Sequence, residues 1–400
     1  MLFAYAEPES AAKGIERLAR EATPLLEKRQ VEYLGIEVRS VLNRCASDRM
    51  PFAWTINPYR GCEFGCRYCY ARYTHEFMGL ARWEDFEEKI YVKRGAARIL
   101  TRELTLRRLN GQSIALGTAT DPYQPAECRF RVTRSLLGVL AQASDLRLSI
   151  TTKSDLVVRD IDLLRRIALR NSLQVNLTVT TLDRDLSRIL ECRAPMPELR
   201  LQALTHLREA GIPAGVTLSP ILPDITDDRA GLEVVIAAAK AHGAVHVFWN
   251  VLFLKPSAQQ AFFPFLAQHF PHLRKRYTAC FARAAFLDRA YTDRIGHLIA
   301  ELKREHGLPD RPAFEMPSSI YETAVEAEQL PLFQLAAPAP PRSTALPCVG
   351  TPPAPRGNRR SDTGQLQPMR YSEPCVGDSI RFADPKGGSR RRPRCAVVES

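Results

Sequence analysis

The chain has 400 residues, 45% of them apolar, which is enough for one large barrel-type domain with appendages or for two ordinary domains. It contains no run of 18 or more apolar residues, and its first residues lack a charged-then-apolar signal pattern, so we expect a cytoplasmic protein with no membrane contact. In that reducing compartment, the ten cysteines do not predict a disulfide framework. The net charge is +12, which suits a polyanionic partner, but half of it lies in residues 336–400, where 11 Arg and Lys face 5 Asp and Glu.

The predicted elements begin with an N-terminal leader, residues 1–50, which is partly helical because residues 11–30 carry apolar side chains at helical spacing. A repeating pattern follows, in which a short β-rich run leads through a loop into an amphipathic helical stretch. The predicted strands cover 52–56, 113–117, 146–152, 173–179, 214–219 and 245–253, and the predicted helices cover 95–109, 134–144, 156–170, 197–211 and 229–243. Six such units predict an α/β fold with a parallel sheet that right-handed crossovers close, partly or fully, into a (β/α)6 barrel.

The C-terminal part is expected to be a helical extension followed by an irregular tail. Residues 258–308 have helical patterns, so the core and its extension span 51–310. Residues 311–335 are expected to form a linker. The segment 336–400 holds 11 of the 29 prolines and a basic run at 389–394, and we expect it to be a disordered, solubilising tail, with phosphate contact by the basic run as the alternative.

Three clustered cysteines follow the first predicted strand. Cys62, Cys66 and Cys69 have CxxxCxxC spacing, and three thiolates on one loop can hold three irons of a [4Fe–4S] cluster. The missing fourth cysteine leaves one iron open to a further ligand, as at catalytic zinc sites. Gly61 and Gly65 let the backbone wrap closely around a bulky group.

Two other interpretations of the cysteines remain open. Zinc bound by the three cysteines with His75 as fourth ligand is one, and three unrelated structural cysteines are the other. Tyr68, between the second and third cysteines, can equally be a core residue.

The motifs of this region resemble the radical SAM superfamily, whose members use a [4Fe–4S] cluster and S-adenosylmethionine (SAM). Over about residues 45–310, the blocks NPYRGC, CRYCYARYTHEF, GTATDPYQPAE, TTKSDLVVRDIDLL and LECRAP are similar to the uncharacterised, DNA repair photolyase-like branch related to spore photoproduct lyase. The resemblance implies a partial barrel of the radical SAM type with the cluster at its mouth. It also implies that SAM chelates the open iron and is cleaved reductively to a 5′-deoxyadenosyl radical, which abstracts hydrogen from a substrate.

Side chains at the ends of the predicted strands have chemistry that suits SAM, because the carboxyl ends of barrel strands carry the site. Thr118, Thr120 and Asp121 could receive its ammonium group, Lys153 its carboxylate, and Thr178 the ribose or carboxylate. The resemblance implies SAM contacts for Thr120, Lys153 and Thr178, and adenine contact for Tyr68. Each of these, taken alone, can instead be an ordinary loop or strand residue.

The sequence also offers candidates for catalytic residues. Glu191 and Arg193 are candidates for contact with SAM or substrate, or else form a surface ion pair. Spore photoproduct lyase returns hydrogen from a cysteine at the end of its second strand, and the resemblance places Thr118 at that position of this chain. A hydroxyl donates hydrogen to a carbon radical poorly, so repair of the spore thymine lesion by that route is doubtful; Cys128 or Cys192 would be the alternative donor.

A short peptide in the linker, from Gln329 to Phe333 (QLPLF), resembles the pentapeptide by which bacterial repair proteins bind the sliding clamp. Leu332 and Phe333 would fill an apolar pocket of that partner. Packing against the barrel, or a chance match, is the alternative.

The favoured hypothesis is a radical SAM enzyme that acts on nucleic acid or a nucleotide and receives electrons from a flavodoxin or ferredoxin. A radical SAM enzyme for a protein or small molecule is the second hypothesis, and a non-enzymatic zinc or electron-transfer protein that binds nucleic acid is the third.

Overall fold

The computed structural model describes residues 14–28, 31–45, 50–106, 109 and 111–310. The QLPLF peptide, the linker at 311–335 and the predicted tail lie outside these residues. Within the described ranges, no helix combines the length and apolar character of a membrane-spanning segment.

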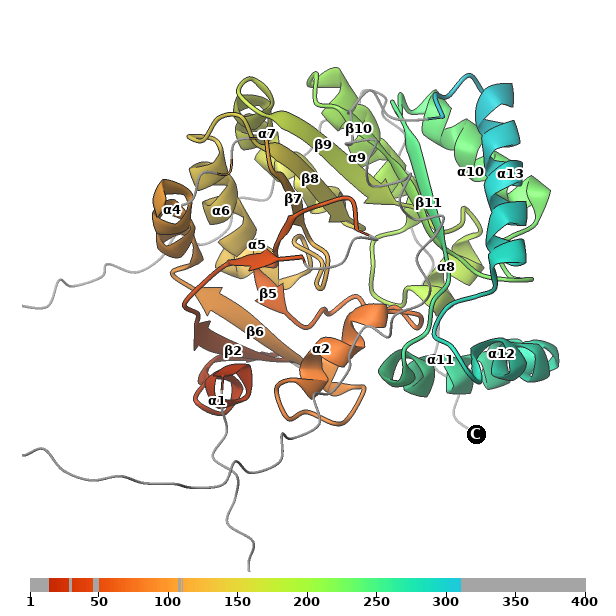
Figure 1. The fold of residues 1–400 in the computed structure, drawn as a ribbon, viewed down its shortest axis with the longest axis horizontal. Coiled ribbons are helices and arrows are strands. Elements are labelled where there is room, and N and C mark those ends of the chain that lie inside the picture. Colours follow the sequence, from red (N-terminus) through yellow and green to blue (C-terminus); the bar gives the residue numbers. More distant parts are fainter. Residues whose placement is uncertain (1–13, 29–30, 46–49, 107–108, 110, 311–400) are drawn as a thin grey trace, which may run out of the picture. The chain divides into compact units, whose positions relative to one another are not determined.

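The main sheet has seven strands in the order β11-β10-β9-β8-β7-β4-β3, and Figure 1 shows its central strands side by side. Six of them are parallel and match the six predicted strands, while β3 (Leu42–Arg44) pairs antiparallel with β4 at one edge. The sheet ends at β3 and β11, so of the two forms that the pattern allows, partly or fully closed, the partial barrel is the one present. The parallel strands are β4 (Trp54–Ile56), β7 (Ser113–Leu116), β8 (Arg147–Thr152), β9 (Ser172–Thr178), β10 (Ala214–Ile221) and β11 (Val247–Val251).

The predicted helices between these strands are also present. Each connects two parallel strands and covers the sheet with its apolar side, as parallel crossovers require. They are α4 (Ala96–Leu106), α6 (Val132–Leu140), α7 (Ile161–Ala168) after the 3-10 helix η2 (Asp155–Asp160), α9 (Pro197–Glu209) and α10 (Arg229–Ala241).

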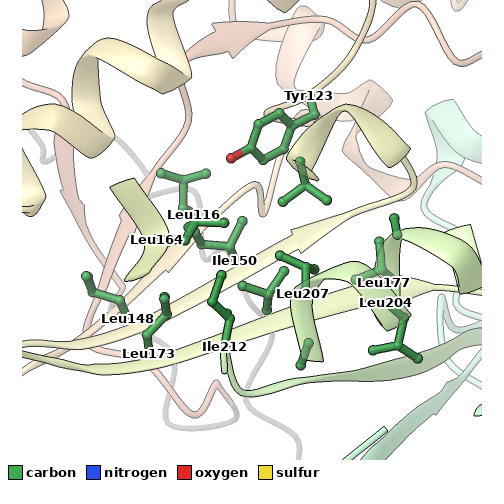
Figure 2. Packing of buried hydrophobic residues seen from close by; sticks show 14 of the residues in the cluster. Leu116, Tyr123, Leu148, Ile150, Leu164, Leu173, Leu177, Leu204, Leu207 and Ile212 are labelled. Atoms are coloured by element: carbon green, nitrogen blue, oxygen red, sulfur yellow. The ribbon is translucent and has the colours of Figure 1, made fainter. Parts of the chain in front are cut away.

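The core lies between the sheet and these helices. Val175 and Leu177 of β9 are fully buried, and Leu204 and Leu207 of α9 pack against the sheet (Figure 2). Burying one such side chain contributes about 1.5–3 kcal/mol. The continuous burial of β9 from its second residue onward is typical of a strand covered on both faces.

The N-terminal region differs from the prediction. Helix α1 covers only Gly14–Arg20, while residues Thr23–Lys28 form strand β1, which pairs antiparallel with β2 (Val31–Glu37). Pro24 explains the early end of the helix, because proline disfavours helical backbone at the residue before it. A second sheet, β1-β2-β6-β5, results, with β6 (Lys89–Arg94) parallel to β2 and antiparallel to β5 (Tyr59–Arg60). The sequence did not predict β5 or β6.

The helical extension is confirmed and lies beside the cysteine loop. Helix α11 (Pro256–His269) contacts η1 (Tyr70–Arg72) and α2 (Tyr73–Glu76), which directly follow the cysteines. Its buried Phe262 and Phe265 belong to the same apolar cluster as Cys62 and Cys66. The extension continues through η3 (Pro271–Leu273), α12 (Arg274–Phe281) and α13 (Arg289–Glu305), which Figure 1 shows beside α10.

Candidate active site

The three predicted ligand cysteines lie on one loop between β5 and η1. Cys62 and Cys66 are buried, Cys69 is half-buried, and all three are free thiols. Gly61, with φ +81°, needs its missing side chain: a Cβ there would lie 2.7 Å from the Lys89 carbonyl oxygen. The loop therefore packs backbone against backbone, and the amide of Cys62 donates to the Phe86 carbonyl at 2.9 Å.

Burial dominates the electrostatics of these thiols. It raises the pKa of all three, to about 12 for Cys66. Cys69 raises the pKa of both Cys62 and Cys66 further, so the three sulfurs are close enough to interact. The positive charge of Lys153 acts against this effect of burial and lowers the pKa of Cys66 and Cys69. The loop thus favours neutral thiols until a cationic ligand compensates for the loss of solvation.

The zinc alternative required His75 as a ligand. His75 instead packs its ring against Phe86 and Tyr91, and its Nε2 lies 3.1 Å from the Lys89 carbonyl oxygen. Burial lowers the pKa of this histidine to about 4. Among the residues that the structure describes, no three His, Cys, Asp or Glu side chains are grouped as ligands of a single metal ion.

A buried carboxylate within the loop anchors it, and the sequence reasoning missed this role. Glu63 accepts hydrogen bonds from the Tyr33 hydroxyl and the Ala126 amide, both at 2.8 Å. Its own amide donates to Gln124 Oε1 at 3.0 Å, and Gln124 Nε2 donates to the Gly61 carbonyl at 3.0 Å. The segment after β7 and strand β2 therefore both hold the cysteine loop.

The segment after α8 (Arg184–Leu190) is paired with the cysteine loop like a short strand. Glu191 forms an antiparallel bridge with Cys66, and the Arg193 amide donates to the Phe64 carbonyl at 3.0 Å. The structure thus brings both predicted residues to the loop. The sequence could not predict this arrangement, because it depends on pairing between two segments that are far apart along the chain.

Glu191 lies in a buried polar cluster. Its Oε2 is 2.5 Å from Nη1 of Arg200, and its Oε1 accepts hydrogen bonds from the Tyr68 and Thr180 hydroxyls. Burial acts to raise the pKa of Glu191, but Arg200 and Lys153 outweigh it and hold the pKa below the usual value. Tyr68 is buried in the apolar cluster that contains the cysteines.

A second carboxylate joins the C-terminal end of the cysteine loop to the segment after α8. Glu87, next to β6 in the short helix α3 (Asp85–Glu88), contacts Arg72 at 2.5 Å and also pairs with Arg193. Buried Arg72 donates in addition to the Cys66 carbonyl at 2.8 Å. Glu87 thus holds η1 at the end of the loop and the segment after α8 together through two guanidinium groups.

The residues that follow β7 lie against the loop as well. Thr120 donates to the Gly61 carbonyl at 2.5 Å, and Thr118 Oγ1 is 3.2 Å from Asn57 Nδ2. Asp121 accepts from the Thr152 hydroxyl at 2.6 Å and from the Lys153 amide at 2.8 Å. Asp121 therefore joins the ends of β7 and β8.

Residues at the ends of β8 and β9 complete the buried polar cluster around Glu191. Lys153 Nζ lies 5.7 Å from the centre of the Tyr68 ring, within cation–π range. Burial acts to lower the pKa of Lys153, but Cys66 and Glu191 outweigh it and raise the pKa. Thr178 is buried, and its carbonyl accepts from Arg200 at 3.0 Å.

Comparison with known proteins identifies the family. Residues 56–231 match the model of the "Radical SAM superfamily". An uncharacterized protein of Mycobacterium tuberculosis is 33% identical over 313 residues, 76% of this chain and 91% of the relative. The chain belongs to the radical SAM superfamily. An uncharacterized protein of Methanocaldococcus jannaschii is 30% identical over 243 residues, which are 60% of this chain and 85% of that protein.

The solved structures agree on the fold. A single-residue mutant of spore photoproduct lyase aligns with a TM-score of 0.53 at 13% identity, over 68% of this chain and 79% of the other. A double mutant of the same lyase, with bound AdoMet and dinucleoside spore photoproduct, aligns with a TM-score of 0.50 at 13% identity, over 70% and 80%. The family match confirms the resemblance to the radical SAM superfamily that the motifs indicated, and this radical SAM protein is an enzyme, so the non-enzymatic hypothesis is not retained.

The two candidate hydrogen donors of the radical SAM enzyme have different environments. Cys128, in α5 (Ala126–Phe130), is exposed and lies near Tyr33 of the second sheet. Cys192 is half-buried, adjoins Glu191 in the segment paired with the cysteine loop, and directs its thiol to the Ile189 carbonyl at 3.6 Å. Of the two, Cys192 is the one next to the cysteine loop.

Proposed function

We propose that Cys62, Cys66 and Cys69 hold a [4Fe–4S] cluster whose remaining iron binds SAM. The observation that carries this proposal is the set of three free, largely buried thiols on one loop, close enough to raise one another's pKa. The chemistry supplied by such a cluster is the reductive cleavage of SAM to methionine and a 5′-deoxyadenosyl radical, which abstracts hydrogen from the substrate.

The loop fits a bulky group that is held by thiolates. Thiolate sulfurs are the usual ligands of iron–sulfur clusters, and the three thiols leave one iron position for another ligand. Gly65 has a φ of +66°, and a Cβ there would lie 2.9 Å from the charged ends of both Arg193 and Glu87, which would have to move. Arg72 and Lys153 add positive charge beside the thiols. These residues orient the ligands and keep water away from them.

The residues at the strand ends are proposed to bind SAM. Lys153 would pair with its carboxylate, and Tyr68 would contact the adenine. Thr120 and Asp121 hold Gly61 and the Lys153 backbone, which supports a positioning role beside any contact of their own. The proposed SAM-binding set is Tyr68, Thr118, Thr120, Asp121, Lys153 and Thr178.

The proposed substrate is a nucleic acid or nucleotide. The support is the fold shared with spore photoproduct lyase, whose solved structures include one with a dinucleoside photoproduct, together with the net charge of +12. A peptide or small-molecule substrate is the alternative. Thr118 in place of a donor cysteine argues for a reaction other than repair of the spore lesion, unless Cys192 supplies the hydrogen.

Metal analysis with SAM cleavage tests the proposal. Anaerobically purified protein should contain about four iron atoms per chain and release 5′-deoxyadenosine from SAM under strong reductant. Cys66→Ala should lose the brown colour and the cleavage, whereas Cys280→Ala, which removes an exposed cysteine, should keep both. A colourless wild-type protein, or equal iron content in the two variants, would refute the ligand assignment.

A further inference from the structure

A cavity of about 480 Å³ away from the cysteine loop is lined by four arginines. They are Arg39, Arg94, Arg98 and Arg102, and we call this cavity the arginine groove. Glu37 is the acidic residue among its lining residues. All four arginines are exposed to solvent.

Three segments of the chain bring these arginines together. Arg94 ends β6 beside Glu37 of β2, with which it is paired in the parallel register. Helix α4 begins two residues later, so Arg98 and Arg102 lie one turn apart on the same side of the helix, about 6 Å along its axis. Arg102 donates to the Arg39 carbonyl at 3.2 Å and so connects the helix to the segment after β2.

A buried carboxylate fixes this arrangement. Glu103 accepts hydrogen bonds from the backbone amides of Val41 and Leu42, at 2.9 and 3.1 Å, and from the Ser40 hydroxyl. The segment that carries Arg39 is therefore attached to α4. The Glu103 carboxylate is buried in these hydrogen bonds and does not face the groove. The groove is a built feature and not a chance meeting of flexible side chains.

The positive charge of the groove is only partly balanced, because one carboxylate, Glu37, lines it with four arginines. In the part of the chain that the structure describes, none of the four guanidinium groups forms an ion pair. Like charges one helical turn apart repel each other. The first helical hydrogen bond runs from the Ile99 amide to the Gly95 carbonyl, so the preceding amides of α4 have no acceptor within the helix and add positive potential.

We propose that the arginine groove binds the phosphate groups of a nucleic-acid backbone. Guanidinium groups bind phosphates through paired hydrogen bonds, and exposed arginines that follow a strand end and a helix face suit an extended polyanion better than an enclosed small molecule. The groove binds phosphates without reading bases, since phosphate contacts fix position and not sequence. This inference rests on the nucleic-acid substrate of the proposed function.

Binding of a fluorescent oligomer of about 20 nucleotides, single-stranded and duplex, to the full-length protein tests the proposal by anisotropy over a range of salt concentrations. Arg98→Gln/Arg102→Gln should weaken binding at least about tenfold and lower the slope of log K against log salt by about 2. Arg39→Gln should act in the same direction. Arg165→Gln/Arg166→Gln, an exposed pair on α7, removes the same charge and should change binding less than about twofold.

Three results would overturn the proposal: equal weakening by the α4 and α7 pairs, unchanged binding in the α4 pair, or binding of inorganic tripolyphosphate with none of the oligomers. Because these arginines lie outside the cysteine loop, the variants should cleave SAM at the wild-type rate without substrate. Absence of SAM cleavage by the wild-type protein would therefore refute the proposed function, whereas a failed binding test would refute only phosphate binding by the arginine groove.

Discussion

The buried ion pair between Glu191 and Arg200 offers the sharpest test of the structure. Both side chains are almost fully inaccessible, at 1% and 0% exposure, and their charged atoms are 2.5 Å apart. The Tyr68 and Thr180 hydroxyls donate to the same carboxylate. Glu191→Gln keeps the shape of the side chain and an acceptor for the hydroxyls but removes the negative charge.

The expected cost follows from what the substitution leaves behind. Arg200 stays charged and buried, and the new amide nitrogen faces its guanidinium group, so unfolding should become easier by about 3–5 kcal/mol. Arg200→Met should cost about as much, because Glu191 loses its guanidinium partner and the carbonyls of Thr178 and Pro195 lose their donor. The double variant removes both charges of the ion pair, so its cost should fall below the sum of the single costs by about 2 kcal/mol.

Anaerobic urea unfolding, followed by far-UV circular dichroism, measures these differences. Glu198→Gln is the matched control, because Glu198 pairs with Arg184 at 3.0 Å on the surface, and breaking that pair should cost less than about 1 kcal/mol. The reasoning fails if Glu191→Gln costs no more than the control, or if the two single costs add within about 0.5 kcal/mol.

Three further predictions concern the barrel. Burial lowers the pKa of His246 to about 4, so the native state favours the neutral ring. The contribution of this ring to the free energy of unfolding is fully present above pH 6.5, and about 3 kcal/mol of it is lost as the pH falls toward 4, which a falling urea midpoint measures. Gly117→Ala should destabilise by at least about 2 kcal/mol, since φ is +94° and a Cβ would lie 2.6 Å from a backbone carbonyl oxygen, whereas Gly138→Ala, with open space in α6, should stabilise by about 0.5–1 kcal/mol; thermal unfolding separates the two. Leu204→Ala should cost about 2–5 kcal/mol and exposed Leu199→Ala less than about 1 kcal/mol on the same helix, and equal urea midpoints would contradict the packing in Figure 2.

Local patterns were sufficient for most of the barrel. Each of the six parallel strands is a short apolar run, and each following helix has its own amphipathic spacing, so both signals lie within a few turns of chain. The cysteine spacing and the neighbouring motifs were sufficient to predict the superfamily. The same information placed Glu191 and Arg193 among the candidates, but as contacts of SAM or substrate, and that role stays a prediction.

The second sheet and the support of the cysteine loop depend on contacts between distant segments. Strand β1 forms because β2 lies beside it, and the residues near Thr23–Lys28 do not predict that pairing. Glu63, Glu87 and Arg200 look like surface charges in the sequence, since charged residues are seldom buried unless they are paired. The Tyr33 partner of Glu63 is 30 residues away along the chain, and the Arg193 partner of Glu87 is 106 residues away.

The sequence alone therefore determined the parallel α/β architecture, the ligand cysteines to be tested and the superfamily, because each is written in a short stretch of residues. Only the tertiary structure decided which carboxylates and guanidinium groups hold the cysteine loop, and that four arginines of three segments share one groove. The physical reason is that burial and charge pairing are properties of neighbours in space, which folding brings together from remote parts of the chain.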